Sequence, residues 1–390
     1  MSDDSAESAG ERTVTVGLVA DPGLPLEIAQ RVSEELPEIL SRQVNNQVDW
    51  KLSVLCEDLG LDAHDRVPIL GIARRKMPDE GWDLMVCLTD LPRINGNRPI
   101  IADISSAQGV ALASLPAIGW MRAQHHVRDT IVHLLGILAR GTLNLGTGHD
   151  KQHEIHHHVR RRSTEWVSPV RQVPAPSDQD IDVYLALTGG RGRMRLLFGM
   201  VRDNRPWRLI PSLSRAFAAA TATAAFGVFY SSIWRMADAL SSARLFVISL
   251  FAIMIMVLWL IAYNSLWERS RSEAERGKAV LYNAATVLTL FLGVAGMYIL
   301  LFAVTLLAAI AVIAAGYLRI RLGHPVGIVD YISLVWLSSS MGTVAGALGS
   351  SLETEGSVLE ATYSRREQQR RARLREREEQ EQEQEQERSE

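Results

Sequence analysis

Three aspartates could place their carboxylates along a single edge of a sheet. Asp21, Asp90 and Asp103 each follow a run of residues that is typical of a buried strand. Because the carboxyl ends of parallel strands meet at one rim, where open α/β sheets bind ligands, we expect these side chains to line that rim. Carboxylate oxygens are the ligands that Mg²⁺ prefers. Aspartate is also a common turn and cap residue, so a purely structural role is the alternative.

Histidines form a second group with a chemical pattern. Eight of the ten lie between residues 125 and 158, and His149, His153 and His157 recur at four-residue spacing. In a helix this spacing puts the three imidazoles on one face, where they could bind zinc or nickel. No cysteine accompanies them, and a solvated polar linker would have the same composition.

One helical segment matches a metalloprotease motif in spacing but not in chemistry. Residues 129–136 read DTIVHLLG, which has the spacing of the zincin sequence HExxHxxG. Asp129 stands in place of the first histidine ligand and Thr130 in place of the glutamate base, so two groups of the zinc-dependent reaction are missing. The sequence also has no GxGxxG or P-loop motif. We therefore predict no cofactor and favour a non-enzymatic protein.

The elements that would position these residues alternate between strand and helix patterns. Short β-branched runs bounded by turn residues predict strands at 13–20, 50–56, 82–89, 99–104 and 109–115. Apolar residues at helical spacing predict a helix over 121–140. Together they predict a cytosolic α/β domain at 13–165, preceded by a disordered N-terminus at 1–12.

Cysteine usage and the first residues agree with a cytosolic domain. Cys56 and Cys87 are the two cysteines, and both lie in predicted strands. Two cysteines in 390 residues do not make a disulfide scaffold, so we expect free thiols in a reducing compartment. The acidic start of the chain has no apolar core, so no cleavable signal peptide is expected.

The second half of the chain is apolar enough to cross a bilayer several times. A hydrocarbon core about 30 Å thick needs about 20 apolar helical residues to span it. Uncharged runs within 215–352 predict four transmembrane helices, at about 216–234, 245–265, 286–312 and 331–351. The run from 279 to 318 is longer than one span needs, but its middle has no turn signal, so we predict one helix there rather than two.

Positive charges favour one orientation of these spans. Lysine and arginine in short flanking segments stay on the cytosolic side of a membrane. The flanks before span one, after span two and after span four are rich in arginine, whereas each loop on the other side holds two arginines. The sequence thus predicts a multi-pass protein of the cell membrane with both termini in the cytoplasm.

Two charged segments flank the predicted spans. Residues 166–214 predict a basic juxtamembrane β unit with a hairpin turn at 189–192 and a strand at 194–201. Its Arg202, Arg205 and Arg208 suit contact with anionic lipid headgroups. The tail at 353–390 passes from an arginine-rich block into repeats of glutamate and glutamine, which predicts a solvated extension that could also bind a partner.

Small residues on span four predict close helix packing. Gly342 and Gly346 form a GxxxG pattern, and Ser350 continues it at the same spacing. Such a ridge lets two helix backbones approach closely. The contact could lie inside one chain, against the small residues Ala218, Ala222 and Ala225 of span one, or it could join two copies into a homo-oligomer.

Three short segments of the membrane half stand out. Residues 199–209 read GMVRDNRPWRL, residues 322–327 read LGHPVG and residues 346–353 read GALGSSLE. In these segments the chain resembles a family of actinobacterial conserved integral membrane proteins. The resemblance covers about residues 196–360. It implies a multi-pass membrane protein and no particular activity.

Three functions remain open from the sequence. The preferred hypothesis is a membrane-anchored binding or scaffolding module whose α/β domain binds a small ligand or a protein. A membrane-tethered enzyme with a metal or ligand pocket at the aspartate rim is the second, and a channel or permease with His324 and Asp330 at an outer vestibule is the third. The predicted spans contain no charged residue, which disfavours ion-coupled transport. The expected partners are the lipid bilayer and an unidentified protein, and no nucleic acid.

Overall fold

The chain divides into two compact units, which are described separately. The first contains residues 1–203 and 365–390 and has an α/β fold, and the second contains residues 204–364 and is helical. The computed structural model describes residues 12–60, 67–95, 98–119, 123–143, 170–174, 181–187, 189–268 and 273–352, with 358, 362–363, 368–369 and 371–372. The predicted combination of an α/β region with a helical region is therefore confirmed.

The first unit is built on one eight-stranded sheet in the order β2-β1-β3-β6-β5-β8-β7, with β4 added to β5. The strands are β1 (Arg12–Ala20), β2 (Val48–Cys56), β3 (Leu84–Thr89), β4 (Arg93–Asn95), β5 (Arg98–Ser105), β6 (Val110–Ser114), β7 (Val170–Pro174) and β8 (Val183–Leu187). β2, β1, β3 and β6 run parallel to one another, whereas β5, β8 and β7 are each antiparallel to their neighbours. All five strands predicted before residue 116 are present.

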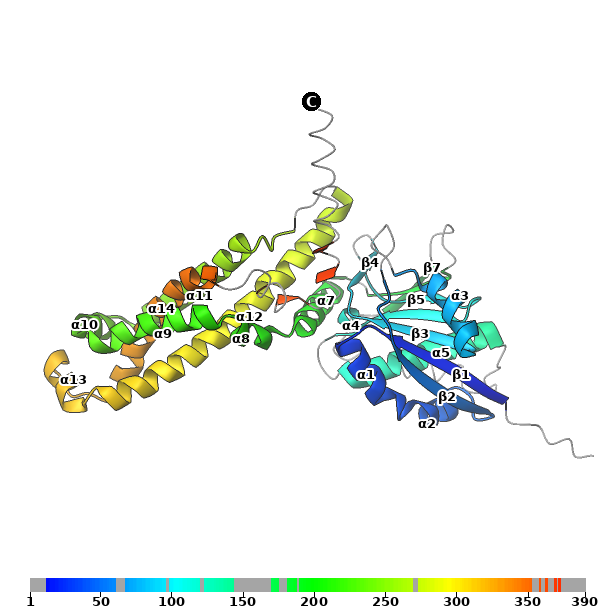
Figure 1. Cartoon of the computed structure of the whole chain (residues 1–390), viewed down its shortest axis with the longest axis horizontal. Coiled ribbons are helices and arrows are strands. Elements are labelled where there is room, and N and C mark those ends of the chain that lie inside the picture. Colours follow the sequence, from blue (N-terminus) through cyan, green and yellow to red (C-terminus); the bar gives the residue numbers. More distant parts are fainter. Residues whose placement is uncertain are drawn as a thin grey trace, which may run out of the picture. The chain divides into compact units, whose positions relative to one another are not determined.

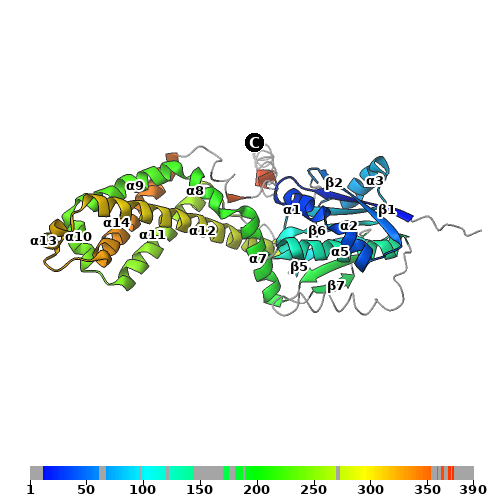
Figure 2. The same cartoon turned by 90° about the horizontal axis from the view of Figure 1, so that it is seen from below.

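Helices cover both faces of this sheet. They are α1 (Leu24–Ser33), α2 (Leu36–Gln43), α3 (Ile69–Glu80), α4 (Leu115–Ile118), α5 (Ala123–Leu143) and α7 (Gly189–Asn204). α1, α2 and α5 pack together on one face, and α3 covers the other (Figures 1 and 2). Every residue of β3 is buried as a result, which explains why its sequence LMVCLT is apolar up to the final threonine.

The segment predicted as a separate juxtamembrane β unit is organised differently. Its strands β7 and β8 extend the main sheet beyond β5. The predicted hairpin turn at 189–192 and strand at 194–201 are wrong, because these residues form helix α7. Leu196, Met200 and Asp203 are buried at intervals of a helical turn. The alternation of arginine with other residues at 191–196 imitates a strand and hides that period.

The described part of the second unit consists of helices. They are α8 (Leu209–Ser212), α9 (Ser214–Phe229), α10 (Ser231–Asp238), α11 (Ser242–Tyr263), α12 (Glu273–Val312), α13 (Ala315–Leu322) and α14 (Ile328–Gly349), with 3-10 turns at Pro206–Arg208 and Ser350–Leu352. α11, α12 and α14 are each long and apolar enough to span a membrane. α9 and α10 amount to a fourth span only if taken together, and they are bent by 85° relative to each other.

The long apolar run predicted as one span is one helix as far as Val312. The two glycines in its middle serve close packing rather than a turn. A Cβ at Gly293 would lie 2.5 Å from Cδ1 of Leu209, and a Cβ at Gly296 would lie 3.2 Å from Cδ1 of Ile210. The short helix α8 therefore packs against the face of α12 that carries these two glycines.

Small residues bring α9 and α14 together within the same chain. A Cβ at Gly346 would lie 3.0 Å from the carbonyl oxygen of Ala216, and Ser350 is buried with its hydroxyl donating to the carbonyl of Ala347. The ridge of span four is thus occupied by α9, and a homo-oligomer through the same ridge would have to displace that helix. The small residues of α9 that pack are not the predicted ones. Ala216, Ala220 and Ala224 are buried, whereas Ala218 and Ala222 are exposed and Ala225 is half-buried.

The helical unit carries large apolar side chains outward and hydroxyl groups inward. Among the exposed apolar residues are Phe229, Phe251, Ile299, Leu307 and Val329. Inside, the hydroxyl oxygen of Ser249 lies 3.1 Å from that of Tyr298 and 3.2 Å from that of Ser340. The indole of Trp336 donates to Ser249 as well. This hydroxyl cluster of Ser249, Tyr298, Trp336 and Ser340 joins α11, α12 and α14.

Candidate functional site

Two of the three predicted rim aspartates follow neighbouring parallel strands. Asp21 comes directly after β1 and Asp90 directly after β3, and these strands pair in parallel. From β1 the chain passes through α1 and α2 to β2 on one side, while β3 and the remaining strands lie on the other side of β1. The strand order therefore reverses between β1 and β3, which is where open α/β sheets bind ligands.

Both carboxylates are buried at this edge. Asp21 is 0% and Asp90 6% exposed. Oδ1 of Asp21 accepts a 3.1 Å hydrogen bond from the backbone N–H of Leu59. Burial raises the pKa of the Cys87 thiol on β3, and the negative charges of Asp21 and Glu57 raise it further. The negative charges of Asp21 and Glu57 therefore act on a side chain inside the sheet.

The third predicted aspartate does not join them. Asp103 lies within β5, which runs antiparallel to β6, and its side chain forms an ion pair with Arg93 on β4. A rim of three carboxylates is therefore not formed, because an apolar run predicts a strand but not its direction. Among the described residues, the acidic and histidine side chains close enough to share a metal ion include none of Asp21, Asp90 and Asp103.

Two acidic residues at the end of β2 were missed by the sequence reasoning, although the signal, a Glu-Asp pair directly after a strand, was present. Glu57 lies 2.9 Å from Nη2 of Arg75 and 2.9 Å from Nζ of Lys76, both on α3. Asp58 accepts a 3.0 Å hydrogen bond from the N–H of Gly60. Because β2, β1 and β3 are adjacent, we define the acidic rim as Asp21, Glu57, Asp58 and Asp90.

A part of the C-terminal tail lies on this unit. Nε2 of Gln369 donates a 2.8 Å hydrogen bond to Oδ2 of Asp58. Arg371 is 7% exposed, although the sequence predicted a solvated tail. The repeats of glutamate and glutamine gave no sign of this contact. The described tail residues therefore contact the β2 end of the acidic rim at Asp58.

Hydrogen bonds also connect the rim to the start of α4, and the end of α4 to α7. The hydroxyl of Ser114, at the end of β6, donates a 2.7 Å hydrogen bond to the carbonyl of Leu91, the residue after Asp90. At the other end of α4, Nε of Arg195 on α7 donates to the carbonyl of Ile118 at 3.0 Å. Burial lowers the pKa of Arg195 to about 10. A continuous series of contacts therefore runs from the rim to α7.

The three arginines predicted to contact lipid headgroups differ in their surroundings. Arg202 donates to the carbonyl of Gly119 and pairs with Asp203, and its side chain is 16% exposed. Arg205 is half-buried with a left-handed φ of 51°, and Arg208 is exposed. Arg202 is thus engaged within the protein, which leaves Arg208 as the member of the set that is open to a headgroup.

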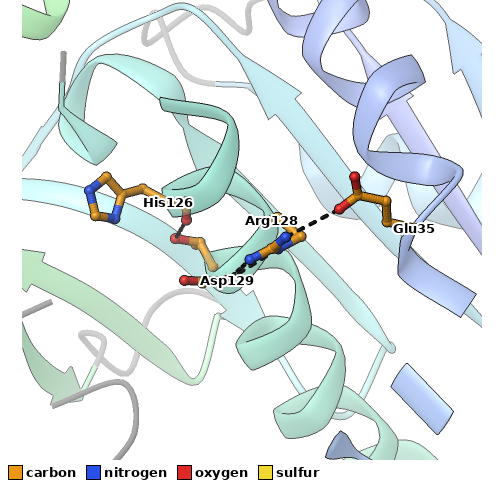
Figure 3. A network of polar contacts seen from close by, with 5 residues as sticks. Glu35, His126, Arg128 and Asp129 are labelled. Carbon is orange, nitrogen blue, oxygen red and sulfur yellow. Dashed lines mark hydrogen bonds and ion pairs between the residues drawn. The ribbon is translucent and has the colours of Figure 1, made fainter. Parts of the chain in front are cut away.

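The two histidine patterns do not build a site in the described structure. His149, His153 and His157 lie outside the described residues. On α5, Asp129 pairs with Arg128, which also reaches Glu35 at 3.1 Å, and the hydroxyl of Thr130 donates to the carbonyl of His126 (Figure 3). The residues at the two positions where the zincin motif departs thus make local structural contacts.

The second unit contains a group that the sequence predicted only in part. Asp238 at the end of α10, His324 after α13 and Asp330 in the first turn of α14 each offer one ligand atom, and these atoms lie within 4.8 Å of one another. Nε2 of His324 is 3.1 Å from Oδ1 of Asp238. Its hydrogen bond to the Pro325 carbonyl, and then its contact with Asp238, raise the pKa of His324. Asp238 was missed because no local pattern marks it.

No protein-family model matches the chain, and no match was found among curated proteins or solved structures. The functional argument therefore depends on the geometry alone.

Proposed function

We propose that the chain is a multi-pass protein of the cell membrane whose cytosolic α/β unit binds a small, positively charged ligand at the acidic rim. The observation that carries this proposal is the position of Asp21 and Asp90 at the ends of β1 and β3, where the strand order reverses. Loops that leave the sheet in opposite directions open a crevice at such a point.

The charge of the rim favours a cation or a cationic group as the ligand. Glu57 is balanced by Arg75 and Lys76, and Asp58 accepts hydrogen bonds. Asp21 and Asp90 keep their carboxylates buried, where an opposite charge interacts more strongly than it does in water. The rim thus gathers four acidic side chains, and this favours a ligand with a positive charge.

The membrane assignment is supported by the distribution of side chains in the second unit. Soluble monomers rarely expose large contiguous apolar patches, whereas the helices here direct phenylalanine, leucine and isoleucine outward. The hydroxyl cluster lies inside, where hydrogen bonds between helices replace those to water. The arginine-rich flanks favour cytosolic termini.

Binding is favoured over catalysis and conduction because polar side chains in both units are engaged in hydrogen bonds within the protein. At the rim, the hydroxyls of Thr89 and Ser114 are engaged with the backbone of Leu91. In the helical unit, Ser249, Tyr298 and Ser340 hydrogen-bond to one another and so hold three helices together. These helices thus serve as an anchor.

The proposal is tested by calorimetric titration of the full chain in lipid nanodiscs with Mg²⁺ and with spermidine. We expect one of these cations to bind at one equivalent and Asp90→Asn to weaken that binding at least about tenfold, the effect of losing roughly 1.4 kcal/mol. Asp79→Asn, an exposed acidic residue on α3, is the matched control and should leave binding unchanged. Every variant also carries Asp238→Asn, so that cation binding at the second unit does not contribute.

If neither cation binds, or if both aspartate variants behave alike, the rim is not a cation-binding site. Asp90→Asn keeps the size of the side chain, and its thermal unfolding curve should be compared with that of the Asp79→Asn protein. A loss of binding with an unchanged unfolding temperature separates ligand contact from structural damage.

A further inference from the structure

We propose that Asp238, His324 and Asp330 form a binding site for a divalent transition-metal ion, zinc in first place. The site belongs to the helical unit and is independent of the acidic rim. Its three residues come from the end of α10, the connection between α13 and α14, and the first turn of α14. Two of these positions are 86 residues apart in the sequence and meet only through the fold.

The donor set suits zinc in chemistry and number. One imidazole and two carboxylates give three protein ligands, and zinc sites that keep an open position have three protein ligands with water as the fourth. Imidazole is a good ligand for zinc, copper, iron and nickel, whereas Mg²⁺ and Ca²⁺ prefer oxygen alone. The histidine therefore selects a transition metal over the common alkaline-earth ions.

The geometry is close to that of a bound site. Ligands about 2.0–2.1 Å from a tetrahedral ion lie about 3.4 Å apart. Nε2 of His324 and Oδ1 of Asp238 are 3.1 Å apart, and the ligand atom of Asp330 lies within 4.8 Å of both. Small movements of half-exposed side chains would close the group around one ion.

Two hydrogen bonds outside the group orient its ligand atoms. Nδ1 of His324 is 3.0 Å from the carbonyl oxygen of Pro325 and donates to it, which leaves Nε2 facing Asp238. The backbone N–H of Gly327 donates a 2.7 Å hydrogen bond to Oδ2 of Asp330 and fixes that carboxylate at the start of α14. Histidine and carboxylate ligands of protein metal sites are held by outer hydrogen bonds of this kind.

The basic side chain three residues before His324 is occupied elsewhere. Arg321 donates to the hydroxyl of Tyr317 at 2.9 Å, and its guanidinium lies 5.2 Å from the ring centre. It therefore does not neutralise the two carboxylates in the described structure. A bound ion would link α10 to α14 and so fix the helix that is bent away from α9.

The test is metal binding by the full chain, produced without a histidine tag and reconstituted in detergent. The starting protein carries His149→Gln, His153→Gln and His157→Gln, because these histidines could also bind zinc. Zinc content is measured by mass spectrometry after dialysis against a zinc buffer with excess Mg²⁺. We expect one equivalent of zinc in this protein and loss of that equivalent in His324→Gln and in Asp238→Asn.

His125→Gln, an exposed histidine on α5, is the matched control and should retain the zinc equivalent. Cobalt substitution adds a readout of geometry, since the visible bands expected of a tetrahedral cobalt site should disappear in His324→Gln. An equal zinc content in His324→Gln and His125→Gln, or no zinc in the starting protein, would overturn the proposal. Asp330→Asn keeps a side-chain oxygen that can accept the hydrogen bond from the Gly327 N–H. A loss of zinc in this variant would therefore show that Asp330 binds the ion, and would not be explained by damage to the start of α14.

Discussion

Gly342 on α14 lies so close to Ala220 on α9 that a Cβ at this glycine would stand 2.5 Å from the Ala220 carbonyl oxygen. No real Cβ tolerates that distance to a backbone atom. The two helices must therefore separate, or the backbone must shift, if any side chain is introduced at this position.

Gly342→Ala should destabilise the helical unit by about 1–3 kcal/mol, the usual cost of overpacking a close contact. Gly316→Ala is the matched control, because nothing lies within 4 Å of a Cβ at Gly316. That control should be neutral or stabilising by up to about 1 kcal/mol, since alanine is the better helix former. Denaturant unfolding in detergent micelles measures both, and equal midpoints for the two variants would contradict the packing described for α9 and α14.

Arg195→Met should destabilise the α/β unit by about 1–3 kcal/mol. The guanidinium donates to the carbonyl of Ile118, and its removal leaves a buried acceptor without that donor. Arg191→Met, at an exposed position of the same helix, should change the free energy of unfolding by less than about 0.5 kcal/mol. Thermal unfolding followed by circular dichroism compares the two, and a larger effect at Arg191 would refute this assignment.

Cys56 should react with a maleimide reagent much faster than Cys87. Cys56 is exposed at the end of β2, whereas Cys87 is buried on β3. Burial and nearby negative charge raise the pKa of Cys87, which lowers the fraction of reactive thiolate. The rate at each cysteine is measured by peptide mass spectrometry, with Cys56→Ser and Cys87→Ser proteins as controls. Equal rates at the two cysteines would contradict the burial described for β3.

The ion pair of His324 and Asp238 predicts a specific pH dependence in the presence of a chelator. The pKa of His324 is raised in the folded chain, first by the Pro325 carbonyl and then by Asp238. Its stabilisation is therefore complete below about pH 6.5, the pKa of an unfolded histidine, and is lost as the pH rises through the folded pKa.

Asp238→Asn should consequently lower the unfolding temperature at pH 6 and have a smaller effect at pH 9. The measurement is a series of thermal unfolding curves between these values in detergent. Asp79→Asn provides the comparison, with an effect that stays constant across this range. A difference between wild type and Asp238→Asn that grows toward pH 9 would have the wrong sign.

The parallel half of the sheet and two rim residues could be predicted because their signals are local. β1 from Val16 onward and β3 as far as Leu88 are fully buried, and these stretches are continuous apolar runs that end near a turn. Asp21 and Asp90 occupy those turns. Once the strands are parallel and adjacent, the two aspartates share an edge without further information.

The remaining parts of the sites depend on contacts between distant residues. Asp103 was placed at the rim because nothing in its own strand reveals that β5 reverses direction. Asp238 meets His324 only after α10 and α14 have packed, and Gln369 reaches Asp58 across 311 residues. The helix α7 was missed for a local reason. Its alternating arginines have the two-residue spacing of a strand, and they obscure the helical spacing of its buried residues.

The bend between α9 and α10 bears on the kind of lipid that suits this protein. α9 has 16 residues and so a length of about 24 Å, whereas α11 and α14 have 22 each and a length of about 33 Å. A hydrocarbon layer about 30 Å thick would match the longer pair and exceed the shorter helix by about 6 Å on one flank. Hydrophobic mismatch of that size locally thins a bilayer or tilts the helices. In the proposed membrane assignment, the lipid beside α9 is therefore the lipid that has to adapt.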